Sequence, residues 1–77
     1  MEKVKHEIKE SFGVLSSTPS EWRKEFNLVS WNGSEPKYDL RQWSPDHSAM
    51  SKGVSLSREE AETLYHLLDG LFGGSNG

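Results

Sequence analysis

The stretch Lys37-Tyr38-Asp39-Leu40-Arg41-Gln42-Trp43 alternates strictly between two kinds of side chain, and the rest of the chain is interpreted from it. In a strand, successive side chains point to opposite faces, so Tyr38 and Leu40 share one face. The other face carries charge and a large flat ring: Lys37, Asp39, Arg41 and Trp43. A guanidinium near an indole suits a polyanion with flat groups, because the cation meets phosphate while the ring stacks on a base. The stretch therefore predicts a strand with a binding face.

Length and composition limit how the chain is stabilised. With 77 residues it is predicted to be one domain over residues 1–72, followed by a flexible Gly-, Ser- and Asn-containing tail over residues 73–77. The absence of cysteine excludes disulfides and cysteine-bearing zinc sites. A chain this small gains only a marginal core of its own. We therefore expect a homodimer.

The net charge of −3 is unevenly distributed. Residues 22–52 hold five Lys and Arg against four acids, whereas residues 53–77 hold one Arg against four acids. A basic face is therefore compatible with an acidic protein. No apolar run is long enough to span a bilayer, and the first residues lack the hydrophobic segment of a signal peptide. The expected location is the cytoplasm, with nucleoid association possible.

Three further segments have strand patterns: Val4 to Leu15, Trp22 to Trp31, and Val54 to Leu56. Gly13 is predicted to mark a bulge or bend in the first of them. In the second, Phe26 and Leu28 are assigned to the core face. Its other face is predicted to be mixed and to carry Arg23, Asn27, Val29 and Trp31. The turns are expected at Ser16–Ser20, at Asn32–Pro36 with its Asn-Gly signal, and at Ser44–Ser48.

The last element is predicted to be a helix that begins at a capping box formed by Ser57 and Glu60. Its apolar stripe is wider than one thin sheet can cover. The surplus is predicted to form the dimer interface, which consists of Leu64, Leu67, Leu68, Leu71 and Phe72. The expected fold class is α+β, with a four-stranded antiparallel curved β-sheet followed by one C-terminal α-helix, assembled as a homodimer.

Four motifs in this order resemble the positive cofactor four family of transcriptional coactivators, and more closely its bacterial YdbC-type members. They are Trp22–Asn27, Val29–Asn32, Tyr38–Asp46 and Lys52–Ser57. The resemblance implies a homodimer whose curved sheets bind single-stranded DNA without strict sequence preference. It also implies contact with the transcription machinery, while RNA binding stays open.

The same resemblance places Arg41, Trp31, Trp43 and Lys52 at binding positions of the family. Lys24 matches a basic position of the second strand, although simple alternation puts it on the core face. Together with residues chosen from the strand patterns, the expected nucleic-acid-binding set is Arg23, Lys24, Asn27, Trp31, Lys37, Arg41, Trp43 and Lys52.

Other interpretations stay open. The two binding-face Trp residues could instead fill a dimer interface, and Arg41 beside Asp39 could be a surface ion pair, so the alternative function is a dimeric protein-interaction module. Asp46-His47-Ser48 has the residue types of a hydrolase triad but lacks a nucleophile elbow, so we do not expect an enzyme. The three His residues lack metal-ligand spacing, and no glycine motif indicates a cofactor. No metal or cofactor is expected.

Overall fold

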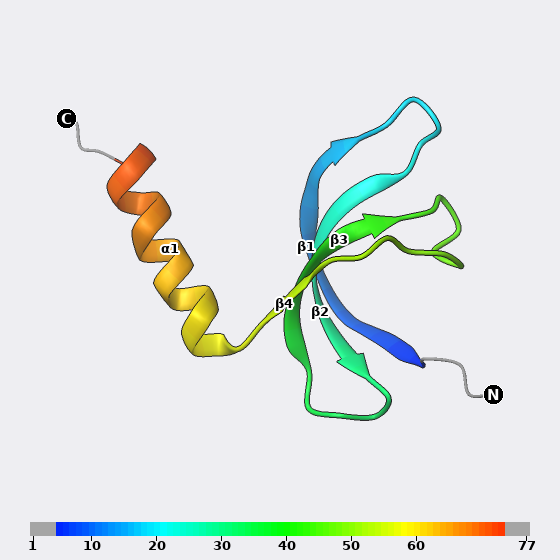
Figure 1. Cartoon of the computed structure of the whole chain (residues 1–77), viewed down its shortest axis with the longest axis horizontal. Coiled ribbons are helices and arrows are strands. Elements are labelled where there is room, and N and C mark those ends of the chain that lie inside the picture. Colours follow the sequence, from blue (N-terminus) through cyan, green and yellow to red (C-terminus); the bar gives the residue numbers. More distant parts are fainter. Residues whose placement is uncertain (1–4, 74–77) are drawn as a thin grey trace.

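The computed structural model describes residues 5–73, which form one antiparallel sheet and one helix (Figure 1). The elements are β1 (His6–Ser17), β2 (Arg23–Trp31), β3 (Lys37–Trp43), β4 (Val54–Leu56) and α1 (Arg58–Phe72). The strands lie in the order β1-β2-β3-β4, so each pairs with its neighbour in sequence. This confirms the predicted four-stranded curved sheet with a C-terminal helix. Val4, predicted to start the first strand, and residues 74–77 of the predicted tail lie outside the described residues.

Local turn chemistry sets the two hairpins at the start of the sheet. Asn32 and Gly33 both have positive φ, of 53° and 76°, and the Ser34 amide donates to the Trp31 carbonyl over 2.8 Å. Positive φ at both central residues is the pattern of a type I′ turn, which Asn-Gly favours. In the β1–β2 connection, the Thr18 hydroxyl accepts from the Trp22 amide over 3.1 Å. The predicted Asn32-Gly33 turn is therefore confirmed, whereas the predicted turn at Ser16–Ser20 begins later, because Ser16 and Ser17 still belong to β1.

The two faces of the sheet are buried in the opposite order to that expected. We call the face with Asn27 and Val29 the concave face; both residues are fully buried. Phe26 and Leu28 lie on the other, convex face and are only half-buried, so their assignment to the core was wrong. The reason is curvature. A sheet that curls around one face buries the side chains there without a covering element, whereas alternation alone says only which residues share a face.

Strand β1 supplies much of the irregularity of the sheet. Its pairing with β2 shifts register between Ile8 and Glu10, between Ser11 and Gly13, and between Val14 and Ser16. Such bulges bend a strand and increase its local twist. One of them falls at Gly13, as predicted.

Helix α1 begins at the predicted capping box: the Ser57 hydroxyl accepts from the Glu60 amide, and the Glu60 carboxylate accepts from the Ser57 amide. The helix extends away from the sheet (Figure 1), its backbone comes close to β3 and β4, and none of its residues is buried. Leu67, Leu71 and Phe72 are 67%, 71% and 79% exposed. Among the described residues, no helix has the length and apolar character needed to cross a membrane.

Candidate nucleic-acid interface

The eight predicted binding residues do not lie on one face. Residues that pair directly across two antiparallel strands point to the same side. Lys24 pairs with Gln42, between the pairs that define the concave face, so Lys24 lies on the convex side. Lys52 lies in the segment just before β4. The concave face holds the others: Arg23, Asn27, Trp31, Lys37, Arg41 and Trp43.

Trp43 is enclosed by the protein itself. Its side chain has no exposed surface, and its ring centroid lies 4.9 Å from that of His6 and 5.6 Å from that of His47. Its indole nitrogen has no hydrogen-bond partner among the described residues. A base can stack only on an accessible ring face, so Trp43 offers no platform in this conformation.

Trp31 is half-buried, and one of its ring faces is already in use. The guanidinium carbon of Arg41 lies 4.4 Å from the Trp31 ring centroid, which is a cation–π contact. The His6 ring lies 5.9 Å away, because His6 pairs with Trp31 across β1 and β2. Trp31 is therefore the more accessible of the two predicted platforms.

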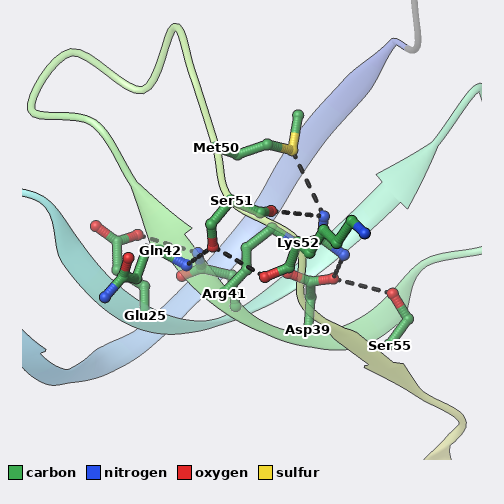
Figure 2. Close-up of polar contacts among 9 residues, drawn as sticks. Glu25, Asp39, Arg41, Gln42, Met50, Ser51, Lys52 and Ser55 are labelled. Carbon is green, nitrogen blue, oxygen red and sulfur yellow. Dashed lines mark hydrogen bonds and ion pairs between the residues drawn. The ribbon is translucent and has the colours of Figure 1, made fainter.

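Arg41 makes most of its contacts inside the protein (Figure 2). Its Nε donates to Asp39 Oδ1 over 2.7 Å and its Nη2 donates to Asp39 Oδ2 over 2.8 Å. Its Nη1 donates to the Ser51 carbonyl over 3.4 Å. The Arg41 side chain is 14% exposed and that of Asp39 is fully buried. A bidentate pair of this kind fixes the guanidinium in place.

A second carboxylate of the concave face, that of Glu25, is also paired. His47 Nε2 lies 3.0 Å from Glu25 Oε2, and the Asn27 amide nitrogen donates to Glu25 Oε1 over 3.0 Å. Arg23 Nε is 3.7 Å from the same carboxylate. With Asp39 bound to Arg41, neither buried acid of this face presents an unpaired negative charge.

The exposed cations of the predicted set do not share one face: Lys37 lies on the concave face, Lys24 on the convex face and Lys52 in the segment before β4. Lys24, Lys37 and Lys52 are exposed, and none of them makes an ion pair within residues 5–73. Lys24 and Lys52 line one open groove of about 490 Å³, together with Arg41, Gln42 and Ser51 and with apolar side chains such as Leu40 and Val54. The groove joins a cation from β2 to one from the segment before β4. Among residues 5–73, no acidic side chain lines this groove, so its charge favours a ligand that carries negative charge.

Two residues of this region, His6 and His47, were not predicted to take part in it. The sequence patterns assigned no role to His6 and placed His47 in a predicted turn. The register that sets His6 against Trp31, and the turn that brings His47 to Glu25 across 22 residues, are not visible in local sequence patterns. Over the described part of the chain, no group of three or more His, Cys, Asp or Glu residues could hold a metal ion.

An antiparallel four-stranded meander followed by one helix defines a class of small α+β domains. Residues 18–67 match the family model described as Transcriptional Coactivator p15 (PC4). The chain belongs to this family. It is also 44% identical over 66 residues to a protein of Treponema pallidum (strain Nichols) described as uncharacterized, a match that covers 86% of this chain and 78% of that protein.

Proposed function

We propose that the protein binds single-stranded nucleic acid, in the first place DNA, without strict sequence preference. In the cell it would serve as a transcriptional coactivator or regulator, or handle exposed strands in the cytoplasm or at the nucleoid, as a YdbC-type bacterial member of the family. The observation that carries the proposal is the groove shared by Lys24 and Lys52 in a chain of the coactivator family. Phosphate contacts supply most of the affinity of such proteins and do not read sequence.

Burial decides which side chains we assign to direct contact. Lys24 and Lys52 bind phosphates of the strand in the groove that they share, and Lys37 and Arg23 are further cations on the concave face. Trp31 stacks on a base. Trp43 and Arg41 are too enclosed for direct contact in this conformation, at 0% and 14% exposure.

We further propose that two chains form a homodimer through α1. The convex face and α1 leave an apolar groove of about 320 Å³ between them, lined by residues such as Phe26, Leu40 and Leu64. A small domain with this much uncovered apolar surface gains stability from a second copy. The proposed interface is the set named from the sequence: Leu64, Leu67, Leu68, Leu71 and Phe72.

A dimeric protein-interaction module remains the second candidate. The observation that favours it is that the concave face is filled by its own side chains, including Trp43 and the Arg41–Asp39 pair. Under this alternative, the exposed part of Trp31 would contact a protein partner and no nucleic acid.

The two functions are separated by titrating the full chain with oligothymidine, a duplex of equal length and oligouridine. We expect the single strand to bind more tightly than the duplex and to quench Trp31 fluorescence, because bases in a duplex are already stacked. Each neutralised phosphate of a single strand contributes roughly −0.7 to the slope of log K against log salt concentration, so Lys24→Ala should flatten that slope by about this amount.

Lys9→Ala is the matched control, since Lys9 lies on β1 and pairs with Glu7 at 3.2 Å. It should leave both affinity and salt slope unchanged. Binding of neither the single strand nor the duplex would favour the protein-interaction module, whereas duplex binding as tight as single-strand binding would contradict the proposed single-strand preference.

A further inference from the structure

The segment before β4 contains a bulge opposite Arg41. Trp43 pairs with Met50 in an isolated bridge, and the Ser51 amide donates to the Gln42 carbonyl over 3.0 Å. On the other side, Leu40 pairs with Val54. Between the hydrogen-bonded residues Gln42 and Ser51 and the pair Leu40–Val54, β3 has the single residue Arg41, whereas the opposing segment has two residues, Lys52 and Gly53. An extra residue of this kind re-aims the side chains next to it.

The bulge packs directly on Arg41. A Cβ atom added at Gly53 would collide with Arg41 Cβ and with the Leu40 carbonyl oxygen. Only glycine allows the backbone to approach β3 this closely. Gly53 therefore sets the distance between the bulge and the stem of the Arg41 side chain.

The guanidinium of Arg41 contacts the same segment at Met50 and Ser51. Its Nη1 donates to the Ser51 carbonyl over 3.4 Å and to Met50 Sδ over 3.6 Å, as Figure 2 shows. Ser51 is fixed twice more, by its amide to the Gln42 carbonyl and by the Gln42 amide to its hydroxyl over 3.1 Å. Lys52 thus follows a residue that is anchored at three points.

Asp39 keeps the guanidinium in this position. It accepts both Arg41 bonds and a third from the Ser55 hydroxyl of β4 over 2.9 Å. Because these contacts use the Nε and Nη2 edge and Nη1 faces Ser51, the guanidinium has little capacity left for an outside phosphate. Lys52, by contrast, is exposed and makes no ion pair within residues 5–73.

We propose that Arg41 is a positioning residue: it holds the Lys52–Gly53 bulge so that Lys52 contacts the strand, and it does not bind phosphate itself. The role of Arg41 in binding rests on the proposed function. Its contact with the Ser51 carbonyl, which we call the clamp, does not. A positive charge at position 41 is then not enough to hold the bulge. The bidentate geometry of the guanidinium is required, and lysine cannot reproduce it.

The binding test is a double-mutant cycle in which the salt slope for oligothymidine is measured. Arg41→Lys should flatten the slope by about 0.7, as Lys52→Ala does, and the double variant should flatten it no further. Arg58→Lys is the matched control, since the Arg58 side chain is 77% exposed on α1 and pairs with Glu62, and it should keep the wild-type slope. An unchanged slope in Arg41→Lys, or additive losses in the double variant, would overturn the proposal.

A DNA-free measurement keeps the two claims separate. Amide hydrogen exchange at Ser51 should be about tenfold faster in Arg41→Lys than in wild type, with exchange at Asn27 unchanged, because local opening is set by local contacts. Unchanged exchange at Ser51 would refute the clamp. A wild-type chain that does not bind oligothymidine would refute the proposed function and with it the positioning role, while faster Ser51 exchange would still support the clamp.

Discussion

His47 Nε2 lies 3.0 Å from Glu25 Oε2 and 3.1 Å from Glu25 Oε1, and this contact joins the turn after β3 to the middle of β2. His47 adopts a positive φ of 61°, a conformation that costs a non-glycine residue free energy. The Glu25 side chain is 5% exposed, so it depends on such partners. The contact holds the turn over the ring of Trp43.

Replacing His47 by Asn should loosen this turn without changing the backbone preference, because Asn tolerates positive φ. The buried Glu25 carboxylate would lose its hydrogen bond to His47. Losing a hydrogen bond to a charged group lowers the free energy of unfolding by an amount on the order of 1.5–3 kcal/mol. Denaturant unfolding monitored by Trp fluorescence measures it, and acrylamide should quench Trp43 more strongly. His66→Asn, at an exposed position of α1, is the control; equal stability of both variants would contradict the assignment.

Alanine substitutions of the two concave-face tryptophans should have different effects, one on stability and the other on binding. Trp43→Ala removes a fully buried ring and should cost about 3–5 kcal/mol of unfolding free energy. Trp31→Ala should leave the fold largely intact and weaken oligothymidine binding by about 1–3 kcal/mol, the typical contribution of one stacked base. Parallel unfolding and binding measurements check this. A folded Trp43→Ala protein that has lost only binding would reverse the two roles.

Gly53→Ala should destabilise the protein, because the added methyl group meets Arg41 Cβ and backbone at Leu40. Overpacking of this kind costs typically 1–3 kcal/mol. Gly13→Ala provides the comparison, since a Cβ there meets nothing within 4 Å. Thermal unfolding of the two variants at equal protein concentration should show a lower Tm for Gly53→Ala only. Equal melting temperatures would mean that the bulge can move away from β3.

Leu71→Glu tests the proposed dimer. A charge at a position that the second copy buries is costly, and folding is expected to be coupled to association. The variant should sediment as a largely unfolded monomer. His66→Glu introduces the same charge on the opposite side of α1, since residues lie about 100° apart around a helix, and should remain dimeric. A folded monomer for Leu71→Glu, or a monomeric wild type, would exclude this interface.

Asp46 predicts a pH dependence in the turn after β3. Hydrogen bonds from the Ser48 hydroxyl and amide and from the Ser44 hydroxyl lower the pKa of the exposed Asp46 carboxyl from 3.8 to about 2. A lowered pKa in the folded state stabilises the fold above pH 3.8, and this contribution is lost as the pH falls towards 2.

Carboxyl chemical shifts followed through an acid titration measure this pKa directly. Ser48→Ala removes the largest cause and should move the Asp46 midpoint back towards 3.8. A wild-type midpoint already near 3.8 would show that the turn does not hold these hydrogen bonds in solution.

Features set by a few neighbouring residues were predictable from the sequence. The Asn32-Gly33 turn, the capping box at Ser57 and the strand at Lys37–Trp43 depend on local chemistry, and all three are present. The contact between Arg41 and Asp39 was also predictable from the sequence, because residues two apart in a strand share a face.

Burial was not predictable in the same way. Alternation groups Phe26 with Leu28 and Asn27 with Val29, but the curvature of the whole sheet decides which pair is enclosed, and curvature depends on register shifts in β1. The likeness of Trp43 to a family aromatic likewise carried no information on its enclosure by His6 and His47. Those contacts join residues far apart in sequence, and no local pattern specifies them.

Strand β1 has a further consequence for how the protein behaves at high concentration. It is 12 residues long and pairs only with β2 among the described strands, so its other edge is a potential template for fibril growth. Its three register shifts break the flat repeat that a stacking strand requires, and Glu7, Lys9 and Glu10 add charge along it. The irregularity of β1 therefore protects the chain against edge-to-edge polymerisation.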